Sequence, residues 1–589
     1  MKRWTQAGVV KALSAAAFVG FASQALAAEV TWDRLLNADK DANNWLMYHQ
    51  SFKGWHHSPL DQINANNVKD LKVAWIHTPS GMKRGIQSFP LVADGVLYYT
   101  STSGQVWALN GTNGALIWRY QAKIDTERAE GTFYQPYNRG LAIGYGKVYI
   151  GTTDGRLIAL DQKTGKVVWD NEILTVEKGN KGFTGAPLIV KDKVIIGSNG
   201  GELSGCCGPI FAVNAQTGEV AWQFDTIGGD QRSRDSWGND SWKIGGGGGW
   251  MTGQYDPKHN TVWWGTANPA PDYDWAGENW MTEGPRPGLN LYSSAVVVLD
   301  ADSGELRAYF QEMPHDAWDF DSAVGEFMLL EKGNSRYMVH PNKGGIIFVY
   351  NPDPAKAKDD VLKVENAYMI GETYNYIKGV NPKTGELIGR RELPEGKHTN
   401  VCPAIDGAIS WNTGAYNPGT GLLYKVTQEW CFDIEVIKSE RPADFSGQAY
   451  FGASWTATHP KTKTDGTPIN GSYGTVQARD PVSGKMKWRV EFKYPPLASL
   501  LSTKGNLVFV PGADGMFTAL DARNGKVLWQ HNNGIGHHGG VISYMVNGKQ
   551  YVAVVTGWGS HVSGNYGPLF GSPFTEMPTE GGNLIVFSL

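Results

Sequence analysis

The sequence predicts an all-β fold of the propeller class, and three observations lead to this expectation. The 74 glycines and 12% aromatic residues suit many short strands joined by tight turns. A hairpin that ends in an aromatic residue recurs along most of the 589 residues. Recurrence of a small antiparallel unit at intervals of tens of residues is typical of sheets repeated around an axis.

The repeated hairpin has recognisable turn chemistry. In each copy an apolar strand runs into Asn or Asp, a turn closes with Gly, and a second strand follows. An example is "IALDQKTGKVVW", in which Gly165 stands where the turn requires positive φ. Five strong copies end at Trp118, Trp169, Trp222, Trp488 and Trp529, and two weaker copies lie near Asp300 and Asn381.

An eighth unit is predicted from the two ends of the chain. The segment "LKVAWIHTP" around Trp75 is expected to pair with the final "NLIVFSL", which would close an eight-bladed propeller of tryptophan-docking repeats. The alternative, an array of β-sandwiches, does not explain one tryptophan per repeat. The long insertions from Asp225 to Trp250 and from Asp272 to Leu289 are expected to form loops above the sheets, where functional residues concentrate.

Residues 1–27 have the features of a secretory signal peptide. Two basic residues come first, Val9 to Leu26 is mostly small and apolar, and an Ala-Leu-Ala cleavage site ends the segment. An anchoring helix is the alternative. No other apolar run is long enough to span a membrane. We therefore expect a single mature propeller domain, residues 28–589, in a bacterial periplasm.

Charge and cysteine usage exclude some functions. The net charge of −4 gives no basic field for nucleic acid. Cys206 and Cys207 are adjacent, whereas Cys402 and Cys431 are far apart in the sequence, and an exported protein can keep disulfides. No Cys-x-x-Cys-His motif occurs, so we expect no covalently bound c-type haem on this chain.

The stretch "PHDAWDFD" concentrates carboxylates between Pro314 and Asp321. Asp319 and Asp321 are two residues apart, and in an extended segment such residues point the same way. Two carboxylates that face one way repel each other unless a positive charge lies between them. The alternative is that aspartates here bond their own backbone in a turn.

Together these motifs resemble the type I quinoprotein alcohol dehydrogenases. The similarity is carried by the hairpins and by "NPAP", "RPGLNLYSSAVVVLD" and "PHDAWDFD", and it covers nearly the whole mature chain. The resemblance implies an eight-bladed propeller that holds pyrroloquinoline quinone (PQQ) and a metal ion on its axis.

The resemblance also implies the roles of particular residues. The base that takes the alcohol proton would be Asp319, and Trp250 would stack on the quinone. The expected metal ligands are Glu202, Asn268, Asp319 and Asp321. The expected cofactor-binding residues are Gln87, Arg139, Thr184, Asn199, Gly200, Gly201, Trp250 and Lys343. Cys402 and Cys431 match the structural disulfide of the family. These residue types suit a flat tricarboxylate and a hard cation.

Several positions depart from the family pattern. Phe133 and Tyr134 stand where an adjacent cysteine pair is frequent, and Leu497 replaces a tryptophan beside the cofactor. The further departures are Gln87 in place of a glutamate and Ser410 in place of an asparagine. The smaller Leu497 suggests room for a substrate larger than methanol.

The adjacent cysteines occur at a different place in this chain. Cys206 and Cys207 follow Glu202 closely, and we predict a disulfide between them that stiffens the ligand loop. Two free, buried thiols are the alternative.

The second aspartate bears on the choice of metal. In the family, an aspartate two places after the base is typical of lanthanide enzymes, and Asp321 stands there. A trivalent ion needs more negative ligands, so we predict one lanthanide(III) ion, with Ca²⁺ as the second choice.

The expected activity is periplasmic oxidation of an alcohol by hydride transfer to PQQ, with a separate soluble cytochrome c as electron acceptor. A homodimer is left open. The alternative function is a non-enzymatic propeller scaffold of the outer-membrane assembly type.

Overall fold

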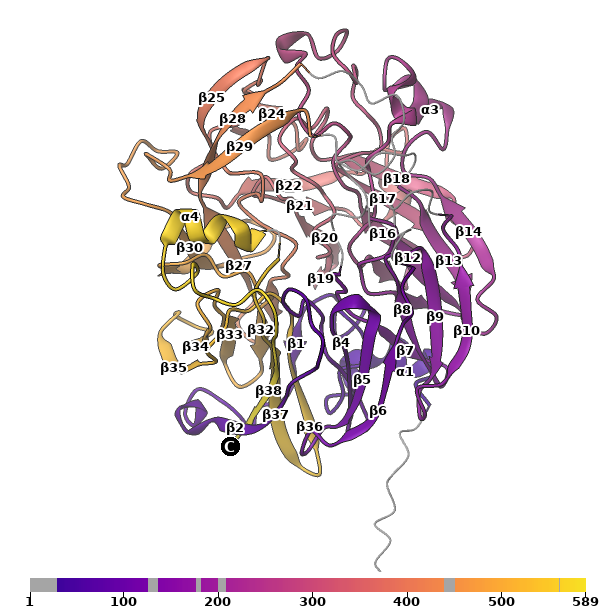
Figure 1. The fold of residues 1–589 in the computed structure, drawn as a ribbon. Coiled ribbons are helices and arrows are strands. Elements are labelled where there is room, and N and C mark those ends of the chain that lie inside the picture. Colours follow the sequence, from indigo (N-terminus) through magenta and orange to yellow (C-terminus); the bar gives the residue numbers. More distant parts are fainter. Residues whose placement is uncertain (1–28, 126–135, 176–181, 200–207, 439–450, 561) are drawn as a thin grey trace, which may run out of the picture.

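The computed structural model describes residues 29–125, 136–175, 182–199, 208–438, 451–560 and 562–589, and it is dominated by strands (Figure 1). The all-β class predicted from the sequence is confirmed, since the described helices are only short. The α-helices are α1 (Trp32–Leu36), α3 (Gln231–Asp235) and α4 (Tyr566–Phe570). The 3₁₀ turns are η1 (Ala38–Lys40), η2 (Val68–Asp70), η3 (Thr102–Gly104), η4 (Asp240–Lys243), η5 (Gly277–Asn279), η6 (Pro354–Lys356) and η7 (Val562–Asn565).

Five sheets of four antiparallel strands follow one another along the first two thirds of the chain, each with its strands in sequence order. The first two contain β3 (Leu91–Ala93), β4 (Val96–Thr100), β5 (Gln105–Asn110) and β6 (Leu116–Gln121), then β7 (Ala142–Gly144), β8 (Lys147–Gly151), β9 (Arg156–Asp161) and β10 (Val167–Glu172). The third contains β11 (Leu188–Val190), β12 (Lys193–Gly197), β13 (Ile210–Asn214) and β14 (Val220–Phe224). The fourth and fifth contain β15 (Gln254–Asp256), β16 (Thr261–Gly265), β17 (Ala295–Asp300) and β18 (Leu306–Gln311), then β19 (Met328–Lys332), β20 (Ser335–Pro341), β21 (Ile346–Tyr350) and β22 (Val364–Met369).

Three further large sheets contain strands that are distant in sequence. One joins β26 (Ala415–Asn417), β27 (Leu422–Glu429), β30 (Tyr473–Arg479) and β31 (Met486–Phe492). Another adds β1 (His57–Ser58) in parallel to β32 (Leu501–Thr503), β33 (Leu507–Pro511), β34 (Met516–Asp521) and β35 (Val527–Asn532). The third joins β36 (Val541–Val546), β37 (Lys549–Val555), β38 (Leu584–Ser588) and β2 (Lys72–His77). The part of the chain that the structure describes thus holds eight sheets of four or five strands.

The predicted pairing of the two ends of the chain is present. β2 runs antiparallel to β38, with Val73 opposite Phe587 and Ile76 opposite Ile585. The ring of Phe587 packs against Trp529 of the preceding sheet, at 5.5 Å between centroids. The sheet that both ends share therefore contacts the sheet that precedes it in the sequence.

Two of the hairpin tryptophans, Trp75 and Trp118, contact the next sheet in the sequence. The indole nitrogen of Trp75 donates to the carbonyl of Gly111, and that of Trp118 donates to Gln162, at 3.3 and 3.0 Å. Gly165 follows in the same turn with φ of 69°, and a Cβ atom there would lie only 2.5 Å from the Trp118 ring. The glycine is therefore required both by the backbone and by the neighbouring indole.

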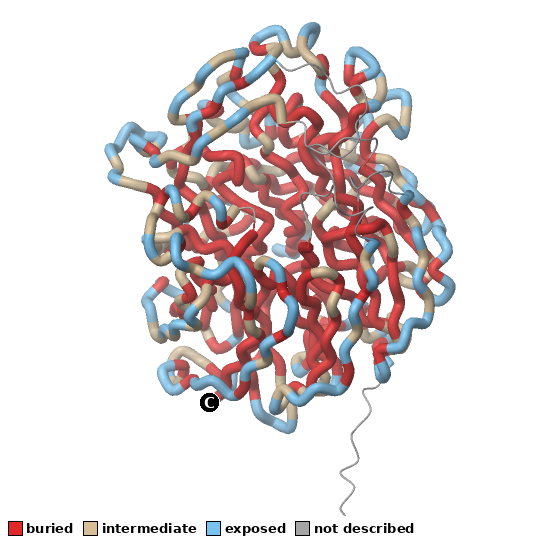
Figure 2. Tube along the Cα trace, in the orientation of Figure 1, coloured by how far each residue is buried: buried red, intermediate tan, exposed pale blue. Residues whose placement is uncertain are grey.

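Burial decreases from the centre of the molecule outwards (Figure 2). The first strands of the sheets, such as β7 and β11, are fully buried. The last strands, such as β6 and β10, expose Leu116 and Val168 by about half. The first strands therefore line the middle, and the segments that precede them meet there.

The predicted long insertions are mainly irregular, apart from α3 and short turns. Two small sheets lie near them at the top of Figure 1. They contain β23 (Gly379–Val380) and β24 (Leu387–Ile388), and β25 (Gly396–Val401), β28 (Cys431–Val436) and β29 (Ala453–Thr458). Among the described helices, none has the length and apolar character needed to cross a membrane.

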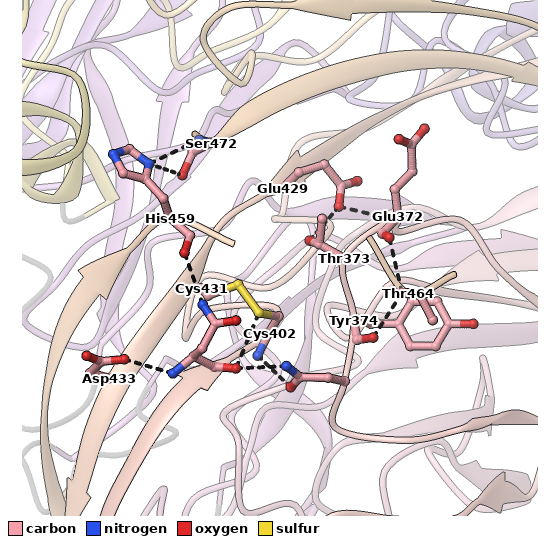
Figure 3. Close-up of a disulfide and its surroundings, with 12 residues drawn as sticks. Glu372, Thr373, Tyr374, Cys402, Glu429, Cys431, Asp433, His459, Thr464 and Ser472 are labelled. Carbon is pink, nitrogen blue, oxygen red and sulfur yellow. Dashed lines mark hydrogen bonds between the residues drawn. A yellow bond between two sulfur atoms is a disulfide. The ribbon is translucent and has the colours of Figure 1, made fainter. Parts of the chain in front are cut away.

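The expected disulfide between Cys402 and Cys431 is present (Figure 3). It links the residue that follows β25 to the first residue of β28, with 4.4 Å between the Cα atoms. Cys206 and Cys207 lie outside the described residues, so their predicted bond remains a prediction.

Candidate active site

One cavity brings together eight of the residues predicted from the sequence. They are Gln87, Arg139, Thr184, Asn199, Trp250, Asp319, Asp321 and Lys343. Gln87, Arg139, Thr184 and Trp250 each come shortly before the first strand of a different sheet. Because these strands line the middle of the molecule, side chains from distant parts of the sequence converge at its centre.

The loop that carries the two aspartates is built around a third one. The Asp316 carboxylate accepts hydrogen bonds from the backbone amides of Trp318 and Phe320, at 2.9 and 2.8 Å. Asp319 lies in the left-handed region, with φ of 64°, which is uncommon for a residue other than glycine. The turn role of aspartate thus belongs to Asp316, while Asp319 and Asp321 line the cavity.

A lysine lies between the two cavity carboxylates. The Lys343 ammonium is 2.9 Å from Asp319 Oδ2 and 3.3 Å from Asp321 Oδ1. Burial opposes the charge on Lys343, but the two carboxylates outweigh this effect and raise its pKa. The second oxygen of Asp321 accepts a hydrogen bond of 2.7 Å from the indole of Trp250. The repulsion expected within the aspartate pair is therefore offset by Lys343.

Arg139 provides a second positive charge on the cavity wall. Its guanidinium carbon lies 4.8 Å from the centre of the Trp250 ring and 5.1 Å from that of Trp411. It also donates to the Thr184 hydroxyl at 2.8 Å. Burial lowers the pKa of Arg139 to about 10, so this guanidinium stays charged at neutral pH and can pair with an anionic ligand.

Three polar atoms of the cavity residues have no hydrogen-bond partner among the described residues. They are Gln87 Oε1, Arg139 Nε and Asn199 Nδ2, all buried. Buried polar atoms normally have partners, so these atoms indicate a polar ligand. With the rings of Trp250 and Trp411, they provide both the flat apolar surface and the hydrogen-bonding groups that a planar, polyanionic quinone requires. The residues of the cavity therefore fit PQQ.

The predicted metal ligands are placed only in part. Asn268 is buried, and its amide nitrogen donates to Asp272 at 2.6 Å, but Asp272 rather than Asn268 lines the cavity. Glu202, Gly200 and Gly201 lie outside the described residues. Within the described ranges, no group of three His, Cys, Asp or Glu side chains could hold a metal ion. The carboxylates of Asp319 and Asp321 suit a hard cation chemically.

The cavity residues that were missed in the sequence include Asp272, Asp406 and Trp411. The position of Asp272, directly after "NPAP", was an available signal for that residue alone. Ser410, which departs from the family pattern, also lines the cavity. Leu497 is buried in an apolar cluster and is not among the residues that line the cavity. Phe133 and Tyr134 lie outside the described residues.

The disulfide lies close in sequence to a segment of the cavity wall. Ala404, two residues after Cys402, donates its backbone N–H to the carbonyl of Trp430 at 3.1 Å. The segment then continues into Ile405 and Asp406, which line the cavity. The cross-link therefore anchors the start of a segment of the wall.

Comparison with known proteins places the chain in a family. Residues 45–356 and 392–552 match the family "PQQ: Glucose/ethanol/alcohol dehydrogenase, beta-propeller domain". A similar protein is the quinoprotein alcohol dehydrogenase PedH of Pseudomonas putida, 32% identical over 95% of this chain and 94% of the relative. The quinoprotein ethanol dehydrogenase of Pseudomonas aeruginosa is 33% identical over 98% and 95%. Among solved structures, a europium-containing methanol dehydrogenase aligns with a TM-score of 0.83 at 28% identity, covering 95% of this chain and all of that one.

The fold and the cavity thus define a propeller protein of the class that binds a planar, anionic cofactor at its centre, and the predicted propeller is confirmed. The chain belongs to the family of PQQ-dependent quinoprotein alcohol dehydrogenases.

Proposed function

We propose that this protein oxidises an alcohol to an aldehyde or ketone in the periplasm, with PQQ as the hydride acceptor and Asp319 as the base. The observation that supports this most directly is the convergence of Asp319, Lys343, Arg139 and Trp250 on one cavity. Family membership supports the same reaction class.

The side chains of the cavity have different roles in this proposal: some bind the cofactor, and one accepts a proton. When bound, PQQ supplies a carbonyl carbon that accepts hydride, and a metal ion supplies Lewis acidity. Trp250 offers a ring face, while Arg139 and Thr184 offer donors to carboxylates. Asp319 accepts the hydroxyl proton of the alcohol, and Lys343, which contacts it at 2.9 Å, orients its carboxylate.

We further propose that the metal is a lanthanide(III) ion held by Glu202, Asn268, Asp319 and Asp321, with Ca²⁺ as the second choice. The negative charge of the cavity walls supports the choice of a trivalent ion. Asp272 and Asp406 add two more carboxylates to the walls of the cavity that contains Asp319 and Asp321. An excess of negative charge favours a trivalent ion over a divalent one.

The remaining elements of the proposal concern the whole protein. Residues 1–27 act as the signal peptide, a soluble cytochrome c takes the electrons, and a homodimer is the oligomeric state to test first. The eight large sheets are eight blades, joined by docking of each hairpin aromatic on the next turn. The contacts of Trp75 and Trp118 with neighbouring sheets support this assignment.

The test is reconstitution of the purified protein with PQQ and either La³⁺ or Ca²⁺, followed by an alcohol panel with an artificial electron acceptor. Alcohol-dependent dye reduction that needs both PQQ and metal is expected. Absence of PQQ binding, measured by absorbance, would contradict the enzyme proposal and favour the scaffold alternative.

A further inference from the structure

A fully buried arginine joins the two segments that carry the acidic residues of the cavity. Arg286 comes from the motif "RPGLN" and has no exposed surface. Burying a guanidinium is costly unless its donors are satisfied. The acceptors that satisfy Arg286 therefore show what this residue holds in place.

Most acceptors of Arg286 are backbone carbonyls from two separate segments. Nε donates to the carbonyl of Pro271 at 2.8 Å, and Nη2 donates to that of Asp272 at 3.2 Å. Nη2 also donates to the carbonyl of Asp316. Nη1 donates to Asn290 Oδ1 at 2.8 Å, which fixes the plane of the guanidinium. One rigid, planar group thus sets the spacing between the two segments.

Both segments lead directly to cavity carboxylates. On the first, Asp272 accepts from the amide of Asn268 at 2.6 Å and lines the cavity. On the second, the Asp316 carboxylate holds the backbone amide of Phe320 at 2.8 Å. This bond fixes the turn that contains Asp319 in its left-handed conformation. A shift at Arg286 would change the distance between Asp272 and Asp319.

We propose that Arg286 is a positioning residue that sets the geometry of the carboxylates toward the metal ion without touching it. The inference rests on the proposed function, since it requires that a cation bind beside these carboxylates. A neighbouring group that orients ligands in this way typically affects metal affinity by about 10- to 100-fold.

The experiment uses Arg286→Lys in the PQQ-loaded protein, with Tb³⁺ as the probe and luminescence excited through tryptophan as the signal. Lysine keeps the charge but cannot reach carbonyls of both segments with a planar fork. We expect Tb³⁺ affinity to fall at least about tenfold and kcat to fall, while KM for the alcohol stays nearly unchanged.

Arg336→Lys is the matched control. Arg336 is also largely buried and bonds Asp256 at 2.7 Å, but it contacts neither segment. We expect this variant to lose a comparable amount of thermal stability and to keep the wild-type Tb³⁺ affinity.

A Tb³⁺ affinity within twofold of wild type for Arg286→Lys would overturn the inference. If that variant does not fold, Asn290→Gly replaces it, because it removes the acceptor of Nη1 and glycine tolerates the φ of 63° at that position. About a fivefold loss of affinity is expected there, and no loss would equally overturn the inference. Failure of the wild-type protein to bind Tb³⁺ or PQQ would instead contradict the proposed function.

Discussion

At the scale of single residues, Asp319 combines a left-handed backbone with a carboxylate on the cavity wall. Asparagine tolerates this backbone region well, so Asp319→Asn should fold normally and retain PQQ. The variant lacks the carboxylate that would accept the alcohol proton, so its turnover should fall by about 10²- to 10⁴-fold. Steady-state kinetics on protein with matched PQQ absorbance provides the measurement. Near-normal turnover would exclude Asp319 as the base.

Asp321 tests the choice of metal. Asp321→Ala removes one cavity carboxylate and the acceptor of the Trp250 indole, so a trivalent ion loses a ligand that a divalent ion needs less. Activity with La³⁺ should be lost, and activity with Ca²⁺ should be unchanged or improved. Parallel assays of metal-free protein reloaded with each ion give the measurement. If the wild-type protein is fully active with Ca²⁺ and inactive with La³⁺, Ce³⁺ and Pr³⁺, the lanthanide prediction is wrong.

Glu312 is a buried acid outside the cavity wall. Burial raises its pKa to about 8, and Tyr350 donates to it at 2.6 Å. The folded state therefore keeps a proton that the unfolded state releases near the ordinary pKa of 4.5. The associated stability is present at low pH and is lost as the pH rises toward 8.

Glu312→Gln should therefore gain Tm relative to wild type as the pH rises from about 5 to 8. Differential scanning calorimetry across this range measures the gain, and Glu580→Gln, at an exposed position, is the control. A Tm difference that does not change with pH would show that Glu312 is ionised in the folded protein.

At the scale of elements, the Cys402–Cys431 bond closes a loop of 29 residues and anchors a segment of the cavity wall. Replacing both cysteines with serine should lower the free energy of unfolding by about 3 kcal/mol and accelerate PQQ loss. Thermal unfolding and PQQ absorbance after gel filtration measure the two effects. Substitution is preferable to reductant, which would also act on Cys206 and Cys207. Unchanged Tm and PQQ retention would show that the wall does not depend on this cross-link.

Local signals explain what could be predicted at this scale. The turn glycine and the aromatic residue of each hairpin are close in sequence, so the strands around Gly165 and Trp169 could be predicted from the sequence. The convergence of Arg139, Trp250 and Asp319 could be expected only through resemblance to a family, because the ring brings together residues that are far apart in sequence. The cavity position of Trp411 depends on the same long-range closure, and no local pattern indicates it. The β1–β32 pairing covers only two residues, too few for a recognisable pattern.

At the scale of the whole molecule, stability depends on the sheet shared by the two ends of the chain. Phe587 is fully buried and packs against Phe517 and Trp529 of the adjacent sheet. Phe587→Ala should cost about 3–5 kcal/mol, with a clear fall in Tm. Leu589→Ala, at an exposed position, is the control and should change Tm little. Equal Tm values for the two variants would show that this sheet does not limit stability.

Because β2 pairs with β38, the sheet that contains both strands can form only in a polypeptide that includes β38. These two strands are neighbours in one sheet, yet nearly all of the described chain separates them, so they can pair only after both have been synthesised. A chain that stops before β38 leaves β2 without its partner and exposes the edge of β37. Such open edges promote aggregation and degradation. We therefore expect truncated products, which lack the hydrogen bonds between β2 and β38, to aggregate or to be degraded.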